Sequence, residues 1–190
     1  MPVFNSNSQM QVIKKSLEGL VEIIPTVYKD ERGSFFETFN KQVFEANGLP
    51  TNFVQDNQSF SKKGVVRGLH FQRTPHAQGK LVRVIVGRVL DIAVDIRPDS
   101  PTFGQYEVVE LYAERGNMFY LPEGFAHGFA ALEDSVFIYK CTNLYHKASE
   151  GGIIWNDPDI HIDWQISNPI VSEKDLQLPP FKVYFEQALS

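Results

Sequence analysis

The sequence predicts an all-β protein of the sandwich or barrel type. Proline and glycine punctuate the chain between short apolar segments, as Pro98, Pro101 and Gly104 do. Short strands joined by turns, without helices between them, favour a sandwich or barrel over alternating β-α units. The segments that are rich in valine, isoleucine, phenylalanine and tyrosine, and are therefore expected to be strands, are 81–86, 89–96, 106–112 and 135–141.

The N-terminal part is expected to hold a strand and a short helix. Residues 33–39 are aromatic and predict a strand that pairs either within the chain or with a partner subunit. Residues 38–46 predict a short helix that ends at Asn47-Gly48.

Three further local signals lie downstream. Gly87-Arg88 stands between two expected strands and indicates a tight hairpin. The strand at 89–96 alternates only in part between apolar and polar residues, so both of its faces are expected to be covered. Ser172, followed by acidic residues, indicates the start of a helix.

Length and composition indicate one packed domain. The chain has 190 residues, 43% of them hydrophobic, and 15 phenylalanines, which argues against disorder. We expect a single domain with three parts: N-terminal strands and a short helix at 1–50, the core of a barrel at 51–165, and a C-terminal extension at 166–190.

Charge and cysteine content exclude several classes. The net charge is -5, so nothing marks a general nucleic-acid or membrane surface. No apolar run is long enough to span a bilayer, and the N-terminus lacks the features of a secretion signal. Cys141 is the one cysteine and can form no internal disulfide, which fits a reducing compartment. We therefore expect a soluble cytoplasmic protein that binds neither nucleic acid nor membrane.

Two segments resemble the two halves of the cupin signature, G-x5-H-x-H…E-x6-G and G-x5-P-x-G-x2-H. The first runs from Gly64 through His70 and Lys80 to Gly87, and the second from Gly116 to Gly128. The spacing is kept, and the resemblance implies a cupin-type double-stranded β-helix, or jelly-roll barrel, with a few short helices at its periphery.

The residues at the metal-ligand positions of this signature differ from those of a metal-binding cupin. Gln72 replaces the second histidine, and Lys80 stands where the carboxylate would be. A cation is a poor ligand for a cation, so we expect no metal there.

With these segments in view, the chain resembles the dTDP-4-dehydrorhamnose 3,5-epimerase family over nearly its whole length. The motifs that carry the resemblance are Asp30-Glu-Arg32-Gly33-x-Phe35-Phe36-Glu37, Phe53-Val-Gln55-Asp56-Asn57, Val66-Arg67-Gly68-Leu69-His70-Phe-Gln72, Gln78-Gly79-Lys80-Leu-Val-Arg83, Pro122-Glu-Gly124-Phe-Ala-His127 and Trp155-Asn156-Asp157-Pro158. The resemblance implies a metal-free homodimer without any cofactor, which inverts C3 and C5 of dTDP-4-keto-6-deoxyglucose, next to its C4 ketone, toward L-rhamnose.

Inversion beside a ketone needs a base, a cation to hold the enolate oxygen, and an acid across the ring. By resemblance, His70 is the base, Lys80 stabilises the enolate and Tyr139 is the acid. Asp175 matches the carboxylate that orients the base, and Asp91 matches an acid of the active site that could pair with Lys80 across the expected hairpin. Each also has a structural interpretation, such as a core histidine, a solvated lysine, a core tyrosine or an acid at a helix N-terminus.

The remaining candidates match family positions that contact the sugar nucleotide. Cationic side chains suit the diphosphate, an aromatic ring could stack on thymine, and polar groups could bind the sugar. These residues are Arg32, Phe35, Glu37, Gln55, Asn57, Arg67, His127, Tyr145, Glu150 and Lys174, together with Lys80.

Three alternatives to a two-centre epimerase stay open. A single-centre 3- or 5-epimerase acting on a related dTDP-4-keto-6-deoxy sugar would use the same histidine and lysine. A metal-dependent cupin would hold one tight equivalent of metal. A non-catalytic binding module would bind the ligand without exchanging hydrogen.

Overall fold

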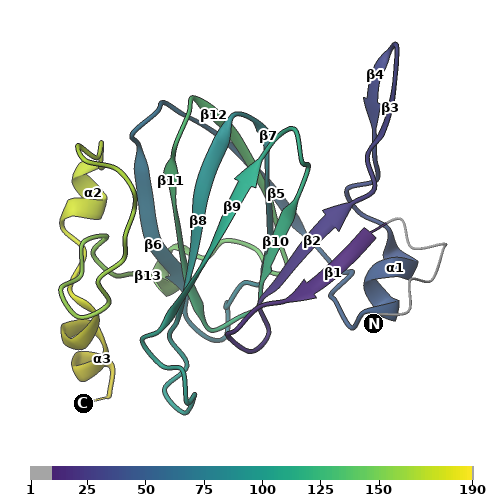
Figure 1. Ribbon diagram of the computed structural model, residues 1–190. Coiled ribbons are helices and arrows are strands. Elements are labelled where there is room, and N and C mark those ends of the chain that lie inside the picture. Colours follow the sequence, from purple (N-terminus) through teal and green to yellow (C-terminus); the bar gives the residue numbers. More distant parts are fainter. Residues whose placement is uncertain (1–9, 190) are drawn as a thin grey trace.

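The computed structural model describes residues 10–189, and its regular secondary structure consists mostly of strands (Figure 1). The N-terminal strands are β1 (Met10–Lys14), β2 (Val21–Pro25), β3 (Tyr28–Asp30) and β4 (Gly33–Phe35). The later strands are β5 (Gln55–Ser61), β6 (Val66–Gln72), β7 (Lys80–Val86), β8 (Arg88–Asp95), β9 (Tyr106–Tyr112), β10 (Met118–Leu121), β11 (Phe125–Ala131), β12 (Ser135–Cys141) and β13 (Glu150–Gly152). The helices are α1 (Lys41–Ala46), α2 (Glu173–Leu176) and α3 (Phe181–Leu189), with a 3₁₀ turn η1 (Lys147–Ser149).

These strands form two facing sheets. One has the order β1-β2-β10-β7-β12-β5 and the other β13-β6-β11-β8-β9. The chain passes from one sheet to the other at most connections after β5, as it does in a jelly roll. The expected all-β jelly-roll class, with short peripheral helices, is confirmed. Because the two sheets share no strand, its form is a sandwich of two open sheets.

The strands expected at 81–86, 89–96, 106–112 and 135–141 are confirmed, but the expected hairpin is wrong. β7 and β8 lie in different sheets, so the chain turns a corner at Gly87 and forms no hairpin there. Gly87 has a φ of 77°, and a Cβ there would come within 2.3 Å of the Asp134 carbonyl oxygen. The glycine therefore serves a close crossing between the sheets, which a local turn signal does not distinguish from a hairpin.

The core fills the space between the sheets. Phe119, Phe129 and Phe137 are buried there, and the rings of Phe129 and Phe137 stack with centroids 4.3 Å apart. A second apolar cluster covers the outer face of the five-stranded sheet, where Trp164 and Phe181 pack. β8 contributes to both clusters, and all of its residues after Arg88 are buried, as its weak alternation predicts.

Between β2 and β5, which both belong to the six-stranded sheet, the chain forms β3, β4 and α1 outside the two main sheets. The helix expected at 38–46 begins only at Lys41, because Asn40 caps it by accepting hydrogen bonds from two backbone N–H groups. The aromatic segment expected as a strand over 33–39 forms one only at β4, which pairs within the chain with β3, and both strands are exposed. Figure 1 shows this β3–β4 hairpin, here called the arm, standing clear of the sandwich on the side opposite α2 and α3.

Candidate active site

His70 and Asp175 form a hydrogen-bonded pair at the mouth of the sandwich. His70 lies on β6, and Asp175 lies on α2, which Ser172 caps by accepting from the Asp175 N–H at 3.1 Å. The His70 Nε2 is 2.7 Å from the Asp175 Oδ1, and the Gly68 N–H donates to Oδ2 at 3.3 Å. The expected helix start at Ser172 thus brings a carboxylate to the histidine.

Electrostatics fix the tautomer of this histidine. Burial would raise the pKa of the Asp175 carboxyl, but the hydrogen bond and charge of His70 and the bonds from Gly68 and Ser172 hold it below its ordinary value. Asp175 is therefore ionised at neutral pH, and Nε2 must be the donor in the pair. Nδ1 is then the ring nitrogen that is left to accept a proton.

A second histidine-carboxylate pair lies deeper. His127 on β11 stands opposite His70 on β6 in the sheet register, and its Nε2 lies 3.0 Å from an oxygen of the fully buried Asp91. Burial raises the pKa of Asp91 and lowers that of His127, so a neutral imidazole is favoured.

Lys80 and Tyr139 face the same interior from neighbouring strands. Lys80 begins β7 and Tyr139 lies on β12, and the Lys80 Nζ is 5.9 Å from the centre of the Tyr139 ring. Burial lowers the pKa of Lys80, opposed by Cys141, Asp91 and Glu150. Burial, with a contribution from Cys141, raises the pKa of Tyr139, which keeps the phenol protonated at neutral pH.

The expected ion pair between Lys80 and Asp91 is not formed. Within the described residues no carboxylate oxygen lies within 4.0 Å of the Lys80 Nζ, and Asp91 bonds to His127 instead. The reason is the corner at Gly87: β7 and β8 belong to facing sheets, so the lysine and the carboxylate interact across the interior and at longer range.

His70, Lys80 and Tyr139, together with Asn57, line two adjoining lobes of one cavity. These four side chains belong to both lobes, whose volumes are about 360 and 290 Å³. Residues that line only the first lobe include Arg67, His127, Ser172, Lys174 and Asp175. Those that line only the second include Gln55, Gln72, Gln78, Tyr145 and Glu150.

Glu150 links two other candidates at the rim. Its carboxylate accepts from the Tyr145 hydroxyl at 3.1 Å and from the Lys174 ammonium at 2.6 Å. The bond from Lys174 lowers the pKa of Glu150, and the same bond raises that of Lys174. The pair is partly exposed, so its charges are available to a polar ligand.

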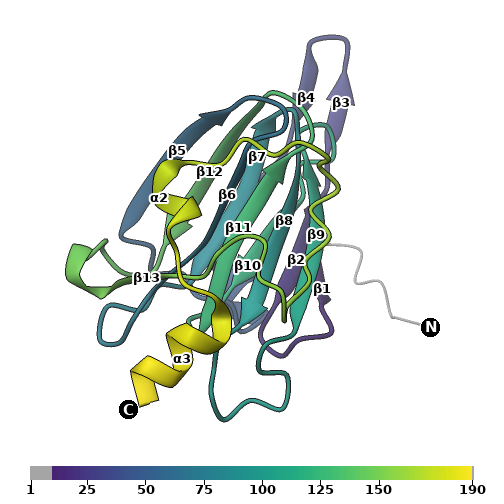
Figure 2. The same ribbon diagram turned by 90° about the vertical axis from the view of Figure 1, so that its left-hand side faces the viewer.

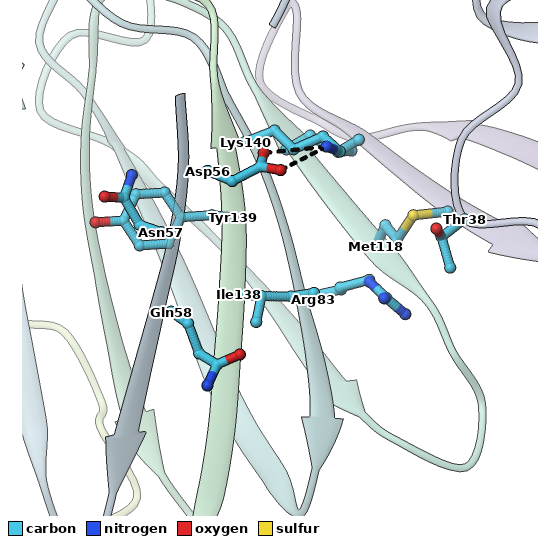
Figure 3. A pocket seen from close by; sticks show the side chains of 10 residues that line it. Thr38, Asp56, Asn57, Gln58, Arg83, Met118, Ile138, Tyr139 and Lys140 are labelled. Carbon is cyan, nitrogen blue, oxygen red and sulfur yellow. Dashed lines mark hydrogen bonds and ion pairs between the residues drawn. The ribbon is translucent and has the colours of Figure 1, made fainter. Parts of the chain in front are cut away.

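The alternation of β5 and β12 decides which side chains reach the cavity. In Figure 3, Asn57 and Tyr139 point to one side, whereas Asp56 and Lys140 point to the other and form an ion pair at 3.0 Å. That second side is the outer face of the six-stranded sheet, where Asp56 and Lys140 line another hollow of about 390 Å³, which Asn57 and Tyr139 also border.

Four sequence-predicted residues do not line the cavity. Asp91 lies behind it and reaches it only through its bond to His127. Arg32 and Phe35 lie on the arm, where Arg32 pairs with Asp30 and Phe35 is 70% exposed. Glu37 follows the arm and accepts a hydrogen bond from the Asn40 side chain at 3.1 Å.

Some lining residues were missed by sequence reasoning as site candidates. Gln72 follows His70 by two positions on the same strand, so its place at the second cupin histidine was a usable signal. Its Nε2 is buried and has no hydrogen-bond partner within the described residues. Cys141 lines neither lobe, but it stands opposite Lys80 in the register of β12 and β7, a relation that only strand pairing reveals.

Across residues 10–189, no group of three or more histidine, cysteine, aspartate and glutamate side chains could hold a metal ion. In the same part of the chain, no helix has the length and apolar character that crossing a membrane requires.

The chain is similar in sequence to proteins of one known family. Residues 14–183 match the family model described as dTDP-4-dehydrorhamnose 3,5-epimerase. A relative with that name from Methanothermobacter thermautotrophicus is 52% identical over 179 residues, which cover 92% of this chain and 96% of the relative.

Two solved structures are similar over most of their length. The dTDP-6-deoxy-D-glucose-3,5-epimerase of Legionella pneumophila Philadelphia 1, in complex with dTDP-4-keto-L-rhamnose, is 45% identical with a TM-score of 0.88, covering 92% of this chain and 94% of that one. A 3'-monoepimerase from Streptomyces bikiniensis, in complex with dTDP-quinovose, is 33% identical with a TM-score of 0.86, covering 92% of this chain and 90% of that one.

Proposed function

The chain belongs to the dTDP-4-dehydrorhamnose 3,5-epimerase family, and we propose that its site carries out that reaction through His70, Lys80 and Tyr139. The substrate is dTDP-4-dehydro-6-deoxy-D-glucose, and inversion at C3 and C5 gives dTDP-4-dehydro-L-rhamnose. The observation that carries the proposal is that an Asp175-oriented histidine, an ammonium and a protonated phenol line one cavity.

The chemistry follows from the ketone. A hydrogen on the carbon beside C4 is acidic because the electrons left behind move onto the ketone oxygen as an enolate. The Nδ1 of His70 accepts this proton, and Lys80 stabilises the oxyanion. Tyr139 then donates its proton to the opposite face of the carbon, which leaves the configuration inverted. After protons are exchanged with solvent, the same cycle at the other carbon completes the isomerisation without any net gain or loss of atoms.

Two carboxylates support these groups. Asp175 accepts from the Nε2 of His70 and stabilises the imidazolium that forms when Nδ1 takes the proton. Asp91 holds His127 and contributes negative charge near Lys80, which favours the charged ammonium inside the sandwich.

The rim of the cavity suits the rest of a nucleotide sugar. Arg67 and Lys174 supply positive charge for the diphosphate. Polar groups that could bind the sugar or the base come from Gln55, Asn57, His127, Tyr145 and Glu150.

The arm is proposed to act in a homodimer. Arg32 and Phe35 are exposed on a hairpin that stands clear of the chain's own cavity (Figure 1). A guanidinium suits a phosphate and an exposed ring suits a thymine base, so these side chains would complete the site of a second copy. Glu37, at the base of the arm, would join them. We also propose a cytoplasmic location, where a reducing environment fits a single buried cysteine.

The decisive experiment is incubation with dTDP-4-keto-6-deoxyglucose in heavy water, followed by NMR. Deuterium at both C3 and C5, with inversion at both carbons, is expected. Absence of deuterium at either carbon would refute the proposal.

The second candidate is a single-centre epimerase on a related dTDP-4-keto-6-deoxy sugar. It is favoured by the similarity to the Streptomyces bikiniensis 3'-monoepimerase. That sequence identity is 33%, lower than the 52% to the 3,5-epimerase of Methanothermobacter thermautotrophicus. Deuterium at one carbon alone, in the same experiment, would support it. The position of that label would tell a 3-epimerase from a 5-epimerase.

A further inference from the structure

Two connections at the rim of the second lobe are joined to one another by hydrogen bonds. Residues 73–79 join β6 to β7, and residues 142–149 follow β12; the two lie side by side at the end of the sandwich near β13 (Figure 2). The Gly79 N–H donates to the Thr142 hydroxyl at 2.8 Å, and the Gln78 side chain donates to the Asn143 carbonyl at 2.7 Å. These bonds make the two connections one structural unit.

A pair of histidines closes the far end of this unit. The rings of His76 and His146 stack with centroids 3.8 Å apart and planes 10° from parallel. Both rings also meet the hydroxyl of Ser149, which is buried, with distances of 2.9 Å from the His76 Nδ1 and 3.0 Å from the His146 Nδ1. One side chain from the first connection is thus held by two from the second.

The shared hydroxyl joins the two rings. Ser149 has one hydroxyl hydrogen and an oxygen that can accept two hydrogen bonds, so it can bond to both Nδ1 atoms at once. One buried hydroxyl therefore holds His76 and His146 in a single hydrogen-bonded cluster.

The cluster of His76, His146 and Ser149 adjoins two residues of the proposed site. Tyr145 immediately precedes His146, and Glu150 immediately follows Ser149. Tyr145 and Glu150 line the second lobe with His70, Lys80 and Tyr139, and a hydrogen bond of 3.1 Å joins them to each other. Within the described chain, His76, His146 and Ser149 themselves line neither lobe.

We propose that His76, His146 and Ser149 form a latch that positions Tyr145 and Glu150 for the sugar nucleotide. They are positioning residues, because they act on the ligand only through their chain neighbours. This inference rests on the proposed function for the identity of the ligand. The base, the ammonium and the acid lie on β6, β7 and β12, outside the two connections, so the latch governs binding and leaves the chemical step unchanged.

The test compares Ser149→Ala with Ser149→Thr, which restores a hydroxyl at the same place. Two measurements are made on the full chain: KM and kcat with the keto sugar, and Kd for dTDP-glucose, which has no ketone and is bound without being turned over. Ser149→Ala is expected to raise KM and Kd about tenfold, as for one lost positioned hydrogen bond, and to change kcat by less than about twofold. Ser149→Thr is expected to recover most of the loss.

A second variant guards against a folding defect at the buried serine. His146 is exposed, and His146→Phe keeps a ring for the stack while removing the nitrogen that meets Ser149. It is expected to raise KM and Kd as Ser149→Ala does, with an unchanged melting temperature.

Wild-type KM and Kd in both Ser149→Ala and His146→Phe would overturn the latch. So would a Ser149→Thr protein whose KM and Kd are as high as those of Ser149→Ala. A loss confined to kcat would also overturn it. The outcomes also separate the two proposals. A wild-type protein that binds dTDP-glucose but does not epimerise the keto sugar refutes the proposed function, while the Kd comparison still decides the latch. A wild-type protein that neither binds dTDP-glucose nor epimerises the keto sugar refutes both.

Discussion

The Nε2 of His70 lies 2.7 Å from the Oδ1 of Asp175, although 105 positions separate the two residues in the chain. β6 supplies the histidine, and a helix of four residues supplies the carboxylate. The bond directs the free nitrogen of the ring, Nδ1, to the role of proton acceptor.

Replacing His70 by asparagine is expected to abolish hydrogen exchange at both carbons, because asparagine cannot accept a proton at neutral pH. The expected loss of kcat is about 10²- to 10⁴-fold, as for removal of a general base. Deuterium incorporation measured by NMR checks this. His161→Asn is the matched control, since His161 is exposed on a connection and has a positive φ that asparagine tolerates. Turnover near the wild-type rate in the His70 variant would end the base assignment.

Replacing Asp175 by asparagine is expected to lower kcat about 10- to 10³-fold without abolishing binding of dTDP-glucose. The amide no longer carries the charge that fixes the tautomer of His70 and stabilises its protonated form. Steady-state kinetics and calorimetry check the two parts separately. Equal kcat in the variant and the wild type would show that Asp175 serves only the helix N-terminus.

Tyr139→Phe is expected to retain exchange at one carbon and to lose full epimerisation, because the proton donor for the opposite face is missing. The measurement is the ratio of deuterium at C3 and C5 to inverted product. Tyr112→Phe, at the end of β9 and away from the cavity, is the control and should behave as wild type. If Tyr139→Phe gives inverted product at the normal rate, the phenol is a packing residue.

The pH profile is expected to report Lys80. Burial lowers the pKa of this ammonium, so the charged form that stabilises the enolate is present at low pH and is lost as pH rises through the lowered pKa. As pH rises, kcat should therefore begin to decrease at a pH lower than about 10, where an ordinary lysine loses its charge. Lys80→Gln should lose about 10²-fold or more in kcat. The control is Lys140→Gln, which removes a lysine from the outer face of the same sheet (Figure 3); it should leave both the rate and the profile unchanged.

A stability prediction concerns Asp95, which lies at the end of β8. Burial opposes its ionisation, but hydrogen bonds from Arg97, Ser100 and Thr102 hold its pKa far below the ordinary value. Because the folded pKa is depressed, its stabilisation is full above the unfolded pKa of about 4 and is lost as pH falls toward the folded pKa. Asp95→Asn should therefore lower the unfolding free energy by about 2–4 kcal/mol near neutral pH, and by less at about pH 3.

Urea unfolding at the two pH values measures the Asp95 effect. Asp99→Asn in the same connection is the control. The Asp99 side chain is exposed, so this substitution should leave the unfolding free energy nearly unchanged. A stability difference for Asp95→Asn that does not shrink in acid would contradict the assignment.

The arm prediction can be tested by mixing two inactive variants. If Arg32 serves the partner's cavity, a heterodimer of His70→Asn and Arg32→Ala chains has one site with both defects and one with neither. Co-refolding or co-expressing the two variants should therefore restore a part of wild-type activity, whereas mixing His70→Asn with Tyr139→Phe should not, since those residues share one cavity. Failure of the first mixture to gain activity would refute arm exchange.

The strands and much of the proposed site could be predicted from the chain alone. Residues 106–112 and 135–141 are strands with the predicted boundaries, because alternation and β-rich composition are local properties. The two histidine segments keep a recognisable spacing for a similar reason: a strand and its turn fix where neighbouring side chains point.

Sequence reasoning failed where a contact depends on distant segments. Gly87-Arg88 looks like a hairpin locally, but the pairing of β7 with β10 and β12 turns it into a corner between sheets. The same corner keeps Asp91 from pairing directly with Lys80 and gives it to His127.

By itself, the sequence determined the fold class, the positions of the main strands and the residue types at hand for proton transfer. These depend on periodicity and spacing, which act over a few residues. Only the tertiary structure decided which carboxylate meets which histidine, that His76 stacks on His146 above Ser149, and that the arm stays outside its own cavity. Those relations follow from sheet order and packing, whose free energies come from segments far apart in the chain and leave no local pattern.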